Sequence, residues 1–178
     1  MAGGFAIFAE RNEMGQPIPQ SWQGMETIQV NVNSKDVYEE VAKATDYTGS
    51  KLIDGDENAR ERILAVDDDL KELGRFWDES VSAAEEWLKE MLVTSHTTKV
   101  DGAMYYVLVL EVSVAWDADL LGSVESTLRS YFISSIIGQW FKFANKGEAA
   151  DYLTNAADML QSVERLLYTR RRPTLPTS

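Results

Sequence analysis

The spacing of apolar positions changes several times along this chain, and each period predicts a different element. Between residues 27 and 32, apolar and polar side chains alternate, which is typical of a half-buried β-strand. Ser34 follows as a predicted helix N-cap, with Asp36 in the first turn, where a carboxylate suits the helix dipole. Apolar residues then recur at helical spacing until Gly49, the predicted end. We therefore expect a strand that leads into a short helix.

A longer amphipathic helix is predicted after residue 66. Asp67, Asp68 and Asp69 are candidate caps, and Asp69 forms a capping-box pair with Glu72. Trp87 widens an apolar stripe whose members step by three or four residues: Leu70, Leu73, Trp77, Val81, Ala84, Leu88 and Met91. The stripe predicts that one face of this helix packs against the domain.

Two β-rich runs, 94–100 and 103–114, flank Asp101-Gly102, a dipeptide typical of a type I′ hairpin turn. The second run carries apolar side chains on both faces. One face has Tyr106, Leu108, Leu110, Val112 and Val114, and the other has Tyr105, Val107 and Val109. Because an isolated hairpin would leave one face in water, we expect the 27–32 strand, a helix or a second subunit to pack there.

Two helices are predicted to finish the fold. The first runs from about residue 117 or 119 to residue 145 and is apolar almost all round, which is typical of a central buried helix. Its predicted core members include Leu128, Phe132, Ile136 and Trp140. A compact turn at residues 145–147 leads into a second helix that ends near residue 167, so the two form an antiparallel helical hairpin.

The expected fold class is mainly α: a helical bundle with a long central helix, a C-terminal helical hairpin, a β-hairpin at about residues 94–114 and one short N-terminal strand. Residues 27–169 form this domain. Residues 1–26 are rich in Gly and Pro, and we expect an extended arm that packs on its own subunit or on a neighbour. The apolar anchors of the arm are Phe5, Ile7, Phe8 and Trp22. Residues 170–178 form an extended basic tail.

Composition excludes several classes of function. The 178 residues contain 17 Lys and Arg, 29 Asp and Glu, one His and no Cys, for a net charge of −12. There is thus no disulfide framework, thiolate nucleophile or two-histidine metal site, and the acidic balance disfavours a general nucleic-acid-binding surface. No apolar run reaches the roughly 20 residues of a membrane span, and the first residues do not resemble a secretory signal. We expect a soluble protein made in a cytoplasm, without a membrane partner.

Motifs that resemble chemical sites have structural explanations. Residues 54–58 begin like a calcium loop, but Ala59 and Ala65 stand where the loop needs Gly and Glu. Residues 49–51 lack the adjacent Gly-Lys of a phosphate loop and are assigned to a helix end. His96 has no carboxylate near it in sequence, so a surface or interface role is favoured over catalysis. We expect no enzyme, cofactor or metal; a metal-assisted hydrolase using Asp54, Asp56 or residues 67–69 is a minor alternative.

Charge is unevenly distributed along the chain. Residues 54–90 contain thirteen acids and five bases, a local net charge of 5 − 13 = −8, which is typical of a solvated helix face and also fits docking of a basic partner. The tail holds the one basic cluster. Its cations either complement a helix C-terminus or dock in an acidic groove of a partner, with contact to nucleic acid less favoured. The predicted docking residues there are Arg170, Arg171, Arg172 and Pro173.

An apolar arm, a hairpin with two apolar faces and a basic tail are typical of an assembly subunit. The predicted partner-binding residues are therefore Phe5, Ile7, Phe8, Trp22, Tyr105, Val107, Val109 and the four tail residues. The hypothesis from another class is an acidic cytoplasmic helical regulator that binds a basic protein.

The region 27–173 also resembles small structural-module proteins of tailed phages and prophages of Bacteroides-type bacteria. The resemblance is carried by Ile28-x-Val30-x-Val32, residues 44–52, Arg75-Phe76-Trp77, the strand 106–112, residues 140–146 and Tyr168-x-Arg170-Arg171-Arg172-Pro173. More broadly, the layout is similar to head–tail connector (adaptor) proteins of tailed phages.

That resemblance implies a virion protein of the phage neck that forms a ring, typically of twelve subunits, beneath the portal. It implies contacts with the portal and adjacent neck or tail proteins, with a C-terminal segment that reaches into the portal. It also implies DNA that passes through an acidic channel without sequence-specific binding. A tail-side ring or a tail terminator is the alternative within this class.

Overall fold

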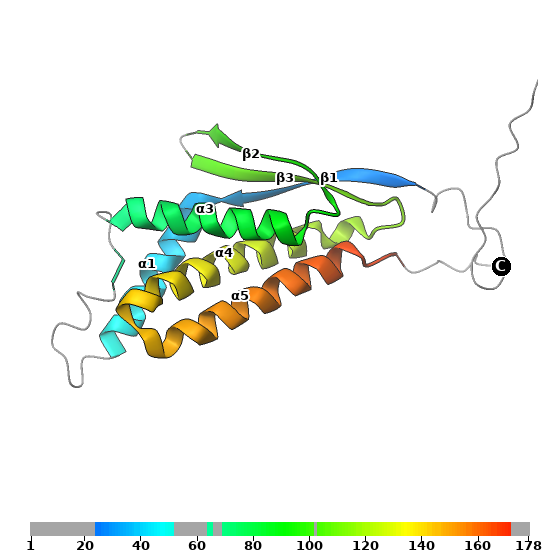
Figure 1. Cartoon of the computed structure of the whole chain (residues 1–178). Coiled ribbons are helices and arrows are strands. Elements are labelled where there is room, and N and C mark those ends of the chain that lie inside the picture. The colour runs from blue at the N-terminus through cyan, green and yellow to red at the C-terminus, as the bar shows by residue number, and fades with distance from the viewer. Residues whose placement is uncertain (1–23, 52–63, 66–68, 102, 172–178) are drawn as a thin grey trace, which may run out of the picture.

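The computed structural model describes residues 24–51, 64–65, 69–101 and 103–171. Several predicted features lie outside these ranges: the arm anchors Phe5, Ile7, Phe8 and Trp22, the calcium-like run at 54–58, the caps Asp67 and Asp68, and the tail from Arg172 onward, including Pro173. In the described parts, a layer of helices lies beneath a small sheet (Figure 1).

Eight elements follow one another along the chain. They are β1 (Met25–Asn33), α1 (Ser34–Lys51), α3 (Leu70–Trp87), β2 (Leu92–Val100), β3 (Ala103–Ser113), a 3₁₀ helix (Ala118–Leu120), α4 (Leu121–Ala144) and α5 (Lys146–Leu167). This order confirms a mainly α fold with a β-hairpin and an N-terminal strand. α4 and α5 form the expected antiparallel helical hairpin.

The strands form an antiparallel sheet in the order β1-β3-β2. The predicted N-terminal strand pairs with β3, so that Val30 lies opposite Leu108. Asp101 has φ 49, the left-handed conformation that a type I′ turn requires of its first central residue. The hairpin prediction is therefore confirmed, with each strand shifted slightly from the expected bounds.

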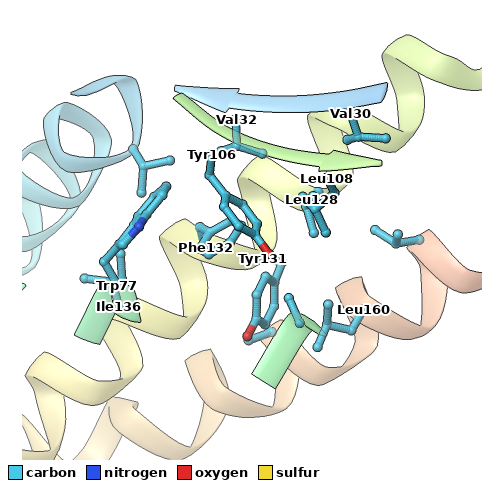
Figure 2. Close-up of a cluster of buried hydrophobic side chains, with 14 of the residues drawn as sticks. Val30, Val32, Trp77, Tyr106, Leu108, Leu128, Tyr131, Phe132, Ile136 and Leu160 are labelled. Carbon is cyan, nitrogen blue, oxygen red and sulfur yellow. The ribbon is translucent and has the colours of Figure 1, made fainter. Parts of the chain in front are cut away.

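One face of the sheet lies on the helices (Figure 1), and the alternation of side chains along the strands explains which residues reach the core. Tyr106 and Leu108 of β3 and Val30 and Val32 of β1 point toward the helices and are buried (Figure 2). Leu110 and Val112 continue the same row. The predicted core face of the hairpin is thus the observed one.

α4 is the central helix, because it contacts β1, α1, α3 and α5. Its Phe132 is fully buried and stacks on Trp77 of α3, with ring centroids 4.6 Å apart. Tyr106 of β3 meets the edge of the Phe132 ring at 5.7 Å. Aromatic pairs of these geometries are favourable beyond their buried area, so this junction joins the sheet to two helices.

A polar seam lies in the core between α3 and α4. The hydroxyls of Ser80 and Ser135 are 2.8 Å apart, and Gln139 Nε2 donates to the Phe76 carbonyl at 3.3 Å. Tyr131 donates its hydroxyl to the Ser80 carbonyl at 2.8 Å, and burial raises the pKa of Tyr131 to about 12. Because buried polar groups need partners, this seam fixes how α3 lies along α4.

Two predicted helix ends are wrong, and a third, Asp69, is the N-cap position of α3 without the predicted capping bond. α1 begins at Ser34 itself, because the Asn33 side chain accepts from the Lys35 amide at 3.0 Å and serves as the cap. Ser34 instead donates to the Met104 carbonyl. Gly49 does not end α1, which continues to Lys51 with Gly49 buried. Asp69 precedes α3, but its side chain makes no capping hydrogen bond, so the predicted capping box is absent.

The later elements need smaller corrections. α3 ends at Trp87, so Leu88 and Met91 belong to the following turn, although both are buried as the stripe predicted. A 3₁₀ turn capped by Asp117 precedes α4, and only Asn145 separates α4 from α5. Trp140 is half-buried and lies at the margin of the core, unlike Leu128, Phe132 and Ile136, which are fully buried.

Gly138 sets the distance between α4 and α5. A Cβ at this position would lie 2.8 Å from Leu153 Cγ and 3.2 Å from the Leu153 backbone nitrogen. We predict that Gly138→Ala lowers the free energy of unfolding by about 1–3 kcal/mol through overpacking. Gly74→Ala on α3 is the matched control, because its Cβ meets nothing within 4 Å and alanine favours a helix by about 1 kcal/mol. Urea unfolding followed by circular dichroism checks both; equal stability would contradict the prediction.

Candidate assembly surfaces

The exposed aromatic and methionine side chains of the helical layer gather at two opposite ends of the molecule. α3, α4 and α5 run side by side, so one end holds the C-termini of α3 and α5 and the start of β1, and the other holds the C-termini of α1 and α4 (Figure 1). Met25, Trp87 and Tyr168 are exposed at the first end. Tyr47 and Phe143 are exposed at the second.

The first end contains a cavity of about 230 Å³, here named the socket. Its floor consists of the buried side chains of Met91, Trp116 and Leu167, and its rim includes Met25 and Tyr168, which are 55% and 59% exposed. Glu90, Glu111 and Arg170 also line it. The socket is thus an apolar hollow with two acids and one base at its edge.

Backbone contacts between remote segments build the socket. The Glu111 amide donates to the Met91 carbonyl at 2.7 Å, which ties β3 to the turn after α3. Trp116 donates its Nε1–H to the Leu166 carbonyl at 2.9 Å, which ties the end of α5 to the segment after β3. The Arg171 amide then donates to the Ala115 carbonyl at 2.9 Å. Because each wall is bonded to another, the hollow is preformed.

Both ends of the described chain lie beside the socket. Val114 donates its amide to the Gly24 carbonyl at 3.3 Å, and Arg170 forms an isolated β-bridge with Trp116. The first and last described residues therefore flank the same short segment after β3. The chain continues in both directions from this end of the molecule.

The opposite end carries Phe143, whose side chain is 73% exposed, the largest exposed fraction among the large apolar residues described. Its ring stacks on the buried ring of Phe76, with centroids 6.3 Å apart and planes at 16°. Lys142 and Lys146 lie beside it in sequence and are exposed. We name Phe143, Lys142 and Lys146 the knob: an aromatic side chain on a supported helix end with two cations.

The outer face of the sheet offers less apolar surface than predicted. Val107 is only 2% exposed, and its cross-strand neighbours on this face are the polar side chains of Asn31 and His96. Tyr105 and Val109 are half-buried. Val107 therefore has little surface left for a partner, while Tyr105 and Val109 keep some. His96 is exposed on this face, as expected for a surface histidine.

A hollow of about 310 Å³ lies beneath the hairpin, where Tyr38, Trp77, Asp78 and Tyr106 line it together with residues of α1, α3, β2 and β3. Burial and the nearby Asp78 carboxylate raise the pKa of Tyr38 to about 12. The Tyr106 hydroxyl donates to Glu85 at 3.0 Å, and burial raises the pKa of Tyr106. Neither phenol is therefore poised to ionise near neutral pH, and Tyr106 acts as a neutral hydrogen-bond donor.

The predicted tail residues are only partly described. Arg170 and Arg171 are exposed, and Arg171 Nε lies 4.0 Å from an Asp117 carboxylate oxygen, a weak surface pair. Sequence reasoning did not select Phe143, Met25 or Tyr168 as binding residues. The available signal was that Phe143 stands among polar residues at the end of a helical pattern, two positions beyond the buried Phe141.

Within the described residues, these surfaces do not coincide with a metal site or a membrane-spanning helix. Within the described ranges, no three His, Asp or Glu side chains cluster in a way that could hold a metal ion, and no helix is long and apolar enough to cross a membrane. Comparisons with protein-family models, curated proteins and solved structures found no match to this chain. The resemblance to phage neck proteins stays a prediction.

Phe143 should contribute little to folding, since most of its ring faces solvent. We predict that Phe143→Ala changes the free energy of unfolding by less than about 1 kcal/mol. Phe141→Ala, two residues earlier on the same helix, should cost about 3–5 kcal/mol because Phe141 is fully buried. Thermal unfolding of the two variants makes the comparison. A large loss in Phe143→Ala would assign that ring to the core rather than to a surface.

Proposed function

We propose that this protein is a structural, non-enzymatic subunit of a homo-oligomeric ring in the neck of a tailed-phage virion, where it joins the portal to the tail. The observation that carries the proposal is the pair of unlike apolar ends on one body, the socket end and the knob end. Contact between unlike patches is heterologous and generates rings when the rotation closes. A C₂ dimer would need one self-complementary patch instead.

The charge of the body is compatible with a DNA channel. The acids Glu72, Asp78, Glu79 and Glu86 are exposed along α3, and the whole chain carries a net charge of −12. An acidic surface repels the phosphate backbone, so DNA would pass without being held. The acidic surface therefore favours a protein through which DNA passes over a protein that binds DNA.

The position of the chain ends supports contacts with other layers of the neck. The chain leaves the described body beside the socket at both Gly24 and Arg171. This end of the molecule is therefore the proposed binding face for the portal or an adjacent neck or tail protein, while the helical body forms the ring. The sequence resemblance to connector proteins is what favours the portal-side ring over a tail-side ring or terminator.

The test is co-assembly of the full chain with the portal protein of the same phage. We predict a closed ring on the portal, detected as a single high-mass species by native mass spectrometry and as a ring in negative-stain electron microscopy. A stable monomer that joins neither portal, neighbouring ring nor virion would overturn the proposal. If that monomer instead formed a complex with a basic host protein that weakens steeply with salt, the acidic regulator would be the better assignment.

A further inference from the structure

We infer that the knob of one copy inserts into the socket of the next copy. The contact places Phe143 over Met91, Trp116 and Leu167, with Lys142 and Lys146 facing Glu90 and Glu111. This inference rests on the proposed function, since it names the interface by which a ring of this chain would form.

Phe143 and the floor of the socket are both apolar, and each is held in place by contacts within its own chain. Phe143 projects from the end of α4 and is supported from beneath by the buried Phe76 ring. The socket is a bonded hollow of about 230 Å³ with an apolar floor. Aromatic anchors that enter preformed pockets are the usual energetic centre of an interface. Neither surface needs to unfold or reorganise before contact.

Charge complementarity selects the socket as the partner of the knob. Lys142 and Lys146 form no ion pair within the part of the chain that the structure describes, and the same holds for Glu90 and Glu111. Two exposed lysines beside Phe143 thus match two acidic residues at the socket, of which Glu90 also lies near Lys89. Arg170 is the one cation among the lining residues of the socket and opposes this pairing. The two acids still outnumber it.

The contact has to involve two molecules. α4 has 24 residues, a length of about 36 Å, and it separates the knob at its C-terminus from the socket end at its N-terminus (Figure 1). A knob cannot therefore reach its own socket. Each copy offers one knob and one socket, so every contact leaves a free site at either end until the ring closes.

The chain suits a cross-linking test because it contains no cysteine. One tagged full-length chain carries Lys146→Cys and a second, differently tagged chain carries Glu111→Cys. After mixing and mild oxidation, we predict a disulfide-linked pair that contains both tags. Ser82→Cys, exposed in the middle of α3, replaces Glu111→Cys as the control and should give only background linkage.

Two further variants test the knob itself. Adding Phe143→Ala to the Lys146→Cys chain should lower the linked yield about tenfold, the loss of an interface anchor, whereas Val93→Ala on β2 should not change it. Two double variants should each associate with themselves more weakly than the native chain in sedimentation. One carries Lys142→Glu and Lys146→Glu, and the other carries Glu90→Lys and Glu111→Lys. Combining all four changes in one chain should restore self-association, because opposite charges then face each other again. Damage to folding would not produce this recovery.

The outcomes separate this inference from the proposed function. The inference is overturned if Glu111→Cys links no better than Ser82→Cys, or if Phe143→Ala leaves the yield unchanged. It is also overturned if replacing Trp22 and Phe8 by Ser abolishes association while Phe143→Ala does not, because the arm would then be the occupant. Rings that assemble on the portal with Phe143→Ala would remove the inference alone. Cross-links without any ring on the portal would remove the proposed function alone.

Discussion

The stacking of Phe132 on Trp77, with Tyr106 against the edge of both rings, is the contact on which the rest of the structure depends. It joins α4, α3 and β3, which are remote from one another along the chain. Tyr106 turns inward to this junction, next to the buried row of Val30, Val32 and Leu108 that lays the sheet on the helices (Figure 2). The polar seam of Ser80, Ser135 and Gln139 then fixes the slide of α3 along α4. This packing of α3, α4 and β3 sets the positions of the socket end and the knob end.

Much of the fold could be predicted from local chemistry. Asp101-Gly102 marks the hairpin because few residues adopt positive φ, and the alternation in β1 shows which side is buried. Helix ends were predicted less well. Asn33, Ser34 and Asp69 all have side chains suited to capping, and which one caps depends on tertiary contacts such as the Ser34 bond to the Met104 carbonyl. No local pattern reports such a contact.

The candidate surfaces were harder to predict, for a physical reason. Periodicity separates a buried face from a polar one, but it does not distinguish an aromatic residue in the core from one at a helix end. Phe141 and Phe143 differ by two positions, and one is fully buried while the other is mostly exposed. The apolar outer row of β3 predicted a docking face, yet Val107 is already covered within its own chain. The socket is built from four remote segments, so no single stretch of sequence contains it.

Folding and association draw on different residues in this molecule. None of the knob residues belongs to the aromatic junction, and the socket walls are held by backbone bonds at the far end of α4 and α5. The knob and the socket are therefore separate from the contacts that stabilise the fold. Gly138 lets α4 and α5 pack closely within the helical layer that separates the two surfaces. In the proposed ring, this close packing would fix the angle between successive copies, and a fixed angle is what allows a head-to-tail chain of subunits to close at one number.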